Sequence, residues 1–468
     1  MKQIPIPFDE SSRRATFSRR RVLQSALIVA AAAATATGLD ACTTQKVARE
    51  KKIILPPGTR PHPGKPEGID MLPAVEHIVI YMQENHSFDS YYGVLGRGDG
   101  FRLGKEGRPT NWNPDLQGNP VKVFHQQDTC NPITGDHSWN GEHIAWNHGK
   151  LDSFVRANNG STNIMGYYDG SQIPFYYGLA RTFPLCDRWF SSVMGPTHPN
   201  RRYLQAATSA GMVVTSVAEV LEYPTAPNGT IWDRLDAHGI SWKDYQIDIG
   251  DIFLWPGSNP AAFLAKTAGN RAFYPKDFLA DCRNGTLPQV SIISPGTQDQ
   301  YDEGSRDVQN GEAYSYSIIN AVMASPNWDK TVLFFTYDES GGCYDHVPPP
   351  PAVAPDDIPP RITVPPDQPG TFAQYGIRVP GFVISPFAKK DYVSHVVHDH
   401  TSILKFLETK FNLGAMTYRD ANADDLLDTL DLSRPGFREP PVLPAPGLPA
   451  GGSACEPQPR PPLNPLPR

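Results

Sequence analysis

The sequence predicts an α/β fold with a mostly parallel central sheet and helices on both of its faces. Short apolar runs rich in β-branched and aromatic residues alternate with longer segments of helical spacing, which is typical of such sheets. Two of the apolar runs end abruptly in acids and amides. In open α/β sheets, ligands bind just beyond the carboxyl ends of the strands. The same pattern therefore predicts a functional site at one edge of the sheet.

The individual elements follow from the spacing of apolar residues. The predicted strands are apolar runs too short for buried helices, and they cover 75–82, 289–294, 332–336 and 378–387. Helical spacing is found at 311–324 and 402–411. From 98 to 177 the chain is instead rich in Asn, Gly, His, Trp and Tyr, so we expect an elaborated loop and cap region beside the sheet.

Length and composition indicate one large folded domain between two segments of different character. The chain has 468 residues, of which 10% are aromatic, and it is long enough to bury a sizeable core. We expect a signal peptide over 1–41, a polar proline-rich tether over 42–72, the folded domain over 73–432 and a disordered proline-rich tail over 433–468. The formal net charge of −7 disfavours nucleic acid as a partner.

The amino terminus has the features of an export signal. The run SRRRVLQ at 18–24 fits the twin-arginine (Tat) pattern, and the alanine-rich run at 26–36 supplies a weakly apolar core that is too short for a membrane span. We therefore expect export by the Tat machinery. Cys42 follows Leu-Asp-Ala in the outline of a lipoprotein cleavage site. Lipidation of Cys42, with contact to a membrane surface, and cleavage at a nearby alanine, with release into the periplasm or medium, remain two alternatives.

Oxygen-bearing side chains follow two of the predicted strands. Glu84 and Asn85 come after the strand at 75–82, and Asp338 and Glu339 come after the strand at 332–336. If these strands are neighbours, their four oxygen ligands converge and suit a hard divalent cation such as Ca²⁺, Mg²⁺ or Mn²⁺, or zinc if histidines join them. Each acid taken alone is also explained as a solvated cap of a strand end.

A nucleophile and an acid candidate lie in two further motifs. Thr197 lies in GPTHPNRR, where prolines on both sides restrict the backbone and fix the hydroxyl. A hydroxyl bound to a divalent cation loses its proton more readily and becomes a nucleophile. Arg201 could then bind anionic oxygens. His137, in the DHSW motif, is of the residue type best suited to protonate a leaving oxygen near neutral pH. Alone, such a threonine is more often a turn residue, and such a histidine more often structural.

In combination, these motifs resemble the bacterial phosphoesterase family that contains non-specific phospholipases C and related acid phosphatases. The matching runs, in family order between 75 and 413, are QENHSFDSYYG, DHSW, GPTHPNR, NGEAY, YDESGGCYDHVPPP and DHTSILKFLE. The resemblance implies an alkaline-phosphatase-like α/β/α sandwich. It also implies that one divalent metal ion assists the hydrolysis of a phosphoester through a covalent phosphothreonine.

The resemblance also implies roles for individual residues. The expected metal ligands are Glu84, Asn85, Thr197, Asp338 and Glu339. The expected catalytic groups are Thr197, His137 and His346, with one histidine stabilising the phosphoryl oxygens and the other protonating the departing alcohol. The residues expected to bind substrate are Asn200, Arg201 and Trp139. Which histidine has which role, and which metal is bound, stay open.

Two positions depart from the family pattern, and the substrate has alternatives. His86 replaces a usual arginine, and Glu303 stands where relatives tend to have a histidine. The expected substrate is a phospholipid, cleaved to diacylglycerol and a phosphorylated head group. A choline head group would suit an aromatic cage, for which the candidates are Trp139, Trp146, Tyr167, Tyr168, Tyr176 and Tyr177. The alternatives are an acid phosphatase of the same family and a catalytically silent lipid-binding lipoprotein.

Overall fold

The computed structural model describes residues 53–130, 135–246, 250–272, 275–296, 300–303 and 306–447. The expected signal peptide and Cys42 lie outside these ranges, as does the first part of the expected tether. No helix within the described ranges combines the length and the apolar character needed to cross a membrane.

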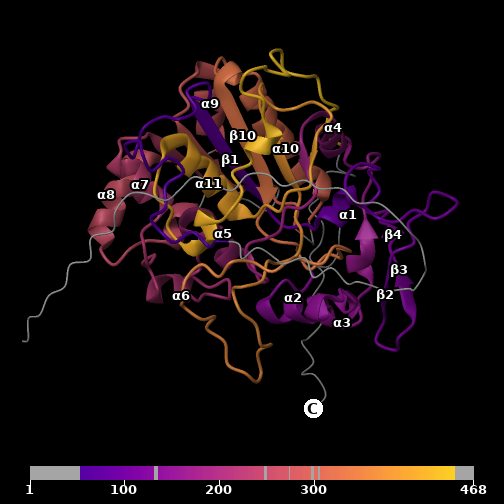
Figure 1. Cartoon of the computed structure of the whole chain (residues 1–468). Coiled ribbons are helices and arrows are strands. Elements are labelled where there is room, and N and C mark those ends of the chain that lie inside the picture. The colour runs from indigo at the N-terminus through magenta and orange to yellow at the C-terminus, as the bar shows by residue number, and fades with distance from the viewer. Residues whose placement is uncertain are drawn as a thin grey trace, which may run out of the picture. The chain divides into compact units, whose positions relative to one another are not determined.

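A central sheet of eight strands organises the described part of the chain (Figure 1). Its strands, in spatial order, are β12 (Val393–Ser394), β6 (Leu185–Cys186), β11 (Gly381–Ile384), β10 (Thr331–Tyr337), β1 (His77–Gln83), β9 (Val290–Ile293), β7 (Trp242–Tyr245) and β8 (Arg271–Ala272). β11 runs antiparallel to both of its neighbours, whereas the other paired strands run parallel. The prediction of a mostly parallel sheet is confirmed.

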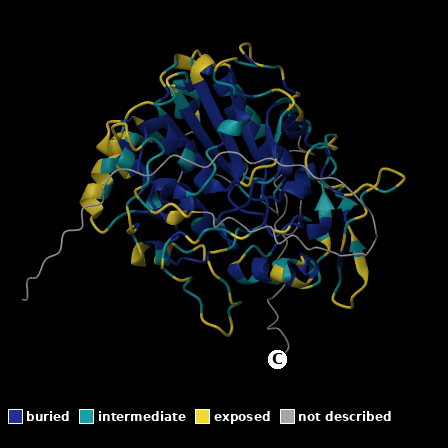
Figure 2. Ribbon diagram, in the orientation of Figure 1, coloured by how far each residue is buried: buried dark blue, intermediate teal, exposed yellow. Residues whose placement is uncertain are grey.

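The two strands expected to carry the site are direct neighbours. β1 and β10 pair in parallel over their full lengths, with Gln83 opposite Tyr337, so both strands end at the same level. Every residue of β10 is buried, and β1 is buried beyond its first residue (Figure 2). All four predicted strands share residues with observed ones, namely β1, β9, β10 and β11.

Helices cover both faces of the sheet. The ring of Phe335 in β10 stacks on Tyr176 of α4 (Pro174–Thr182), with 5.9 Å between ring centroids. The preceding residue, Phe334, packs edge-on against Phe406 of α11 (His400–Phe411), with 4.9 Å between centroids. Because successive side chains of a strand point to opposite faces, α4 and α11 lie on opposite sides of the sheet. The expected α/β/α layering is confirmed.

The remaining helices surround this sheet. The predicted helix at 311–324 is α10 (Val308–Met323), which packs against α4, and the one at 402–411 is α11. The other α-helices are α1 (Phe88–Tyr92), α2 (Trp139–Trp146), α3 (Phe154–Ala157), α5 (Thr197–Ala206), α6 (Val217–Glu222), α7 (Ile231–Ala237), α8 (Pro260–Asn270), α9 (Pro275–Asn284) and α12 (Tyr418–Ala421). The 3-10 helices are η1 (Asn147–Gly149), η2 (Asn163–Met165), η3 (Asp251–Leu254), η4 (Trp328–Lys330) and η5 (Leu427–Thr429).

The loop-rich region from 98 to 177 packs beside the sheet, as expected. It contains α2, α3 and two small sheets, β2 (Trp112–Pro114) with β3 (Pro120–Lys122), and β4 (Phe124–His125) with β5 (Gly166–Tyr167). Most of a second apolar cluster comes from this region, including Phe101, Phe154 and Ile164. The cap therefore has a core of its own.

Parts of the two flanking segments are attached to the domain. In the expected tether, Gly58 N–H donates to the carbonyl oxygen of Ala415 at 2.8 Å and Met71 N–H to that of Lys410 at 2.6 Å. In the expected tail, Phe437 and Leu443 are buried in the main core. The disordered tail therefore does not begin at 433, because these two side chains supply apolar surface to the domain; residues 448–468 lie outside the described ranges.

Glu312 ties the carboxyl-terminal segment to the sheet layers. Its Oε1 accepts hydrogen bonds from the backbone N–H groups of Phe175 at 2.8 Å and Tyr176 at 3.1 Å, at the start of α4. Its Oε2 accepts one from Gly447 N–H at 2.7 Å. One buried carboxylate thus caps the start of α4 and binds the backbone of Gly447.

Replacing this carboxylate tests its anchoring role. We expect Glu312→Ala to lower the free energy of unfolding by about 2 kcal/mol, because it removes a helix cap and leaves buried N–H groups unpaired. The Gly447 amide should also exchange its hydrogen faster. Urea unfolding and hydrogen exchange measure the two effects. Glu439→Ala, at an exposed position of the same segment, should change neither; equal effects of both substitutions would contradict the assignment.

Candidate active site

The carboxylates expected to form the site lie where β1 and β10 end. Glu84 directly follows β1, and Asp338 and Glu339 directly follow β10. Asp338 N–H donates to the carbonyl oxygen of Gln83 at 3.1 Å, so the pairing continues beyond the strands. The predicted convergence of the two strand ends is therefore present in the fold.

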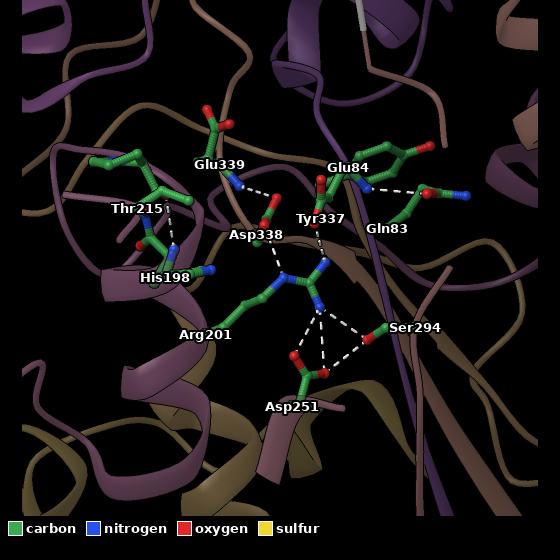
Figure 3. A network of polar contacts seen from close by, with 12 residues as sticks. Gln83, Glu84, His198, Arg201, Thr215, Asp251, Ser294, Tyr337, Asp338 and Glu339 are labelled. Atoms are coloured by element: carbon green, nitrogen blue, oxygen red, sulfur yellow. Dashed lines mark hydrogen bonds and ion pairs between the residues drawn. The ribbon is translucent and has the colours of Figure 1, made fainter. Parts of the chain in front are cut away.

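Arg201 of α5 lies between these carboxylates (Figure 3). Its Nε donates to Asp338 Oδ2 at 3.0 Å, and one terminal nitrogen donates to Glu84 Oε1 at 2.9 Å. The other terminal nitrogen contacts Asp251 Oδ1 at 3.1 Å and Ser294 Oγ at 2.8 Å. One guanidinium thus links the ends of β1 and β10 to two further segments.

Two residues expected to bind substrate make contacts within the protein. Arg201 is 4% exposed, and its guanidinium is directed at protein carboxylates. Asn200 is fully buried, and its amide nitrogen donates to the carbonyl oxygens of Val193, Gly195 and Pro196. These bonds hold the turn that precedes Thr197.

Thr197 is the first residue of α5 and lines a cavity of about 780 Å³. Other residues of this cavity wall are Glu84, His137, Trp139, Val214 and Glu303. Thr197 and Arg201 are one helical turn apart and therefore lie on the same face of α5. The positive end of the helix dipole at Thr197 favours an anionic group in the cavity.

Two of the expected metal ligands have oxygens without partners. Asn85 Oδ1 and Glu339 Oε1 are buried and accept no hydrogen bond within the described residues. Buried polar atoms are nearly always paired, so each of these oxygens needs a donor or a cation. Carboxylate and amide oxygens are the ligands that hard divalent cations prefer. The donor set at these strand ends therefore fits such an ion.

The electrostatics of the site point the same way. Burial, followed by the nearby Asp338, raises the pKa of Glu84 to about 8. Burial raises the pKa of Asp338 to about 6, and burial together with Asp338 and Glu142 raises the pKa of Glu339 well above its usual value. Glu84 and Asp338 share one guanidinium with Asp251, so the carboxylates outnumber the cation that they contact, and a divalent ion would stabilise their ionised forms.

His137 lies beside Glu339 at the cavity. Its Nδ1 donates to the carbonyl oxygen of Gly135 at 2.9 Å, and its Nε2 lies 3.7 Å from Glu339 Oε1. Since a carbonyl can only accept, the proton of a neutral ring is on Nδ1. Nε2 is then the nitrogen that takes up or releases a proton at the cavity.

His346 lies in a different cluster. Its Nδ1 is 2.6 Å from Asp89 Oδ2, and Asp89 and Asp345 both pair with the buried Arg378. Among described residues, the wall of the Thr197 cavity does not include His346. His346 therefore does not share the cavity wall with His137, although both were expected in the active site.

Several supporting residues were not predicted. Asp251 and Ser294 bind Arg201, Glu142 accepts a hydrogen bond from the Ser340 hydroxyl at 2.7 Å, and His400 Nε2 donates to the carbonyl oxygen of Asp338 at 2.8 Å. Ser294 ends a predicted strand and His400 lies in the DHTS motif, so a sequence signal existed for both. Asp251 and Glu142 have none that we can identify.

The two departures from the family pattern lie close to the site. His86 is buried, and its Nε2 donates to the carbonyl oxygen of Asp302 at 2.8 Å. Asp302 N–H in turn donates to the carbonyl oxygen of Glu84 at 2.7 Å. These bonds hold the loop that brings Glu303 to the cavity wall. Glu303 thus brings a carboxylate to the cavity wall.

The aromatic residues proposed for a choline cage are dispersed. Trp139 lines the Thr197 cavity, but Trp146 lines another groove, together with His143 and His148. Tyr176 is buried in the core, where its hydroxyl donates to Asp302 at 2.7 Å. The described residues do not bring these rings into one cage.

The chain is similar in sequence to several known proteins. The model of the Phosphoesterase family matches residues 75–414. Phospholipase C B of Mycobacterium tuberculosis (strain CDC 1551 / Oshkosh) is 31% identical, covering 84% of this chain and 83% of the relative. Non-hemolytic phospholipase C of Burkholderia pseudomallei is 33% identical, covering 77% of this chain and 59% of the relative. A solved protein of the alkaline phosphatase superfamily from Vibrio parahaemolyticus has a TM-score of 0.38 at 11% identity, covering 78% of this chain and 72% of its own, too low to support an argument.

Glu142 generates a pH-dependence prediction. Burial raises its pKa from 4.5 to about 8, so the folded protein holds this proton more tightly than the unfolded chain does. Its contribution to stability is therefore fully present below pH 4.5 and is lost as the pH rises through 8. Glu142→Gln imitates the protonated acid. We expect the variant to gain about 3 kcal/mol relative to the wild type between pH 5 and 8.5.

Urea unfolding in EDTA at several pH values measures this difference. Glu222→Gln, at an exposed position, is the control and should track the wild type. Parallel stability curves for wild type and Glu142→Gln would show that Glu142 ionises normally in the folded state.

Proposed function

Because this chain belongs to the phosphoesterase family and is a phosphoric ester hydrolase, we propose that it is an exported, metal-dependent phospholipase C. The proposed reaction converts a phospholipid to diacylglycerol and a phosphorylated head group. Its chief support in the structure is that β1 and β10 end side by side and that Glu84, directly after β1, lines one cavity with Thr197 at the start of α5.

The proposed reaction has two displacements. The Thr197 hydroxyl oxygen attacks phosphorus, the bond from phosphorus to the glycerol oxygen breaks, and diacylglycerol leaves. Water then attacks phosphorus, the bond from phosphorus to the Thr197 oxygen breaks, the threonine hydroxyl regains a proton, and the phosphorylated head group leaves. The helix start at Thr197 favours the negative charge that develops on the phosphoryl oxygens.

The proposed cation is held by the strand ends. Its ligands would be Glu84, Asn85, Asp338, Glu339 and the Thr197 hydroxyl. When bound, a divalent ion lowers the pKa of the hydroxyl and stabilises charge on the phosphoryl oxygens. These donors are all oxygens, which favours Ca²⁺, Mg²⁺ or Mn²⁺ over zinc.

His137 is the proposed acid for the departing alcohol. Its Nδ1 bond to Gly135 fixes the ring, and its Nε2 lies in the cavity beside Glu339. The protonated imidazole is the form that would donate a proton to the departing oxygen. His346, held by Asp89 outside the cavity wall, would act only on the structure of the site.

A lipid substrate is supported by the cavity wall. Val213, Val214 and Trp139 line the same cavity as Thr197, and Val214 is 39% exposed. An apolar wall beside a polar reaction centre suits a molecule with acyl chains on one side of its phosphate.

Export is supported by the sequence alone. The twin-arginine run at 18–24 is the basis for proposing the Tat route, and lipidation of Cys42 remains an alternative to release after cleavage.

The nucleophile is tested by substitution. We expect Thr197→Ala to lower turnover of phosphatidylcholine at least about 1,000-fold, because no oxygen remains to attack phosphorus, while Thr197→Ser keeps measurable activity. Release of phosphocholine measures turnover, and circular dichroism checks the fold. Wild-type activity in the alanine variant would reject this nucleophile.

A comparison of two substrates distinguishes a phospholipase C from an acid phosphatase. Phosphocholine release from phosphatidylcholine should exceed phosphate release from nitrophenyl phosphate. The reverse order would favour a phosphomonoesterase acting through the same residues.

Metal removal tests the proposed cation. We expect chelation to lower activity at least about 100-fold and Ca²⁺, Mg²⁺ or Mn²⁺ to restore it. Glu339→Gln should lower the affinity for the activating metal ion, because it removes one of the charged ligands. Glu106→Gln, at an exposed position, is the matched control. Full activity of the chelated protein would contradict metal dependence.

A further inference from the structure

A second group of metal-ligating side chains lies near the β12 edge of the sheet. It consists of His398, between β12 and α11, and of Asp424 and Asp428, on the segment that contains η5. One ligand atom from each residue lies within 4.8 Å of the other two. None of the three lines the Thr197 cavity.

Hydrogen bonds fix the proton of His398. The Ser394 hydroxyl donates to Asp428 Oδ2 at 2.5 Å, so its oxygen is free to accept from His398 Nε2–H at 3.1 Å. With the proton on Nε2, Nδ1 has a lone pair. That lone pair lies 3.5 Å from Asp424 Oδ1.

Nδ1 has no hydrogen-bond partner within the described residues, although His398 is only 1% exposed. In the tautomer set by Ser394, the Nδ1 lone pair and Asp424 Oδ1 face each other without a cation between them.

Asp428 has a similar unsatisfied atom. Its Oδ1 is buried, accepts no hydrogen bond within the described residues, and lies 4.0 Å from His398 Nε2. Lys389 is a neighbouring positively charged residue. Its Nζ donates to the carbonyl oxygen of Asp428 at 2.6 Å. This hydrogen bond goes to the main chain of Asp428 and not to its carboxylate.

We propose that His398, Asp424 and Asp428 bind a structural divalent metal ion of the zinc type, separate from the catalytic site. An imidazole with two carboxylates is a ligand set that zinc accepts, and water would complete the coordination. Ligands of a tetrahedral zinc ion are about 3.4 Å apart, close to the separation of Nδ1 and Asp424 Oδ1. The side chains of Asp424 and Asp428 are 36% and 22% exposed, which leaves them room to close on the ion.

The ion would hold the start of α11. His398 lies two residues before His400, whose Nε2 donates to the carbonyl oxygen of Asp338. Joining His398 to the η5 segment therefore restrains the loop that supports one of the active-site carboxylates. This site does not depend on the proposed lipase activity.

Zinc stoichiometry tests the site. Wild type, the double variant Asp424→Asn/Asp428→Asn and the control Asp425→Asn are incubated with Zn²⁺, freed of excess and analysed for zinc per chain. Asp425 lies in the same segment, but its Oδ2 accepts from the Thr409 hydroxyl at 3.1 Å and it is outside the cluster. We expect the double variant to lose one zinc per chain and the control to lose none. Any zinc at the strand ends is common to all three proteins.

Equal zinc content in a folded double variant and in the wild type would overturn the proposal. If the double variant fails to fold, ¹⁵N NMR of histidine-labelled wild type tests whether His398 binds zinc. Zn²⁺ should shift the Nδ1 resonance of His398. In the single variant Asp424→Asn, the same shift should require at least a tenfold higher zinc concentration. A His398 resonance unchanged by Zn²⁺ would also overturn the site.

Discussion

The arrangement of the site depends on one buried cation, the guanidinium of Arg201. It joins Glu84 after β1 to Asp338 after β10, and it also binds Asp251 and Ser294. Like charges at neighbouring strand ends repel, so the two carboxylates need a positive group between them. Because Arg201 and Thr197 share one face of α5, the same contact sets the position of the threonine hydroxyl. The proposed nucleophile is therefore positioned by the residue that contacts these carboxylates.

The surrounding loops are held by neutral contacts. His86 and His400 donate to the carbonyl oxygens of Asp302 and Asp338, and burial keeps the pKa of both rings low, at about 3 and about 4. Neutral histidines add no charge to a site that already has several carboxylates. They fix the backbone while the charged groups remain available for chemistry.

The sequence was sufficient to predict four strands of the sheet, β1, β9, β10 and β11, and the meeting of the β1 and β10 ends. Apolar runs such as 332–336 are short, strongly β-forming and followed by acids, and neighbours in a parallel sheet end at the same edge. The contacts of individual side chains were harder to predict from the sequence, because they depend on packing between distant segments. Arg201 faces protein carboxylates, and His346 pairs with Asp89. The short apolar anchors Phe437 and Leu443 were likewise hidden among prolines.

The turn after Glu339 leaves no room for a side chain at its two glycines. Gly341 and Gly342 have φ angles of 64° and 69°, and a Cβ on Gly341 would lie 2.6 Å from the carbonyl oxygen of Asn85. A Cβ on Gly342 would lie 2.7 Å from the backbone nitrogen of Asp136. Three motifs far apart in the gene thus meet at the main chain, where no side-chain exchange can relieve a clash. A side chain at either glycine would therefore displace the main chain of a second motif, and with it the residues which that motif places at the site.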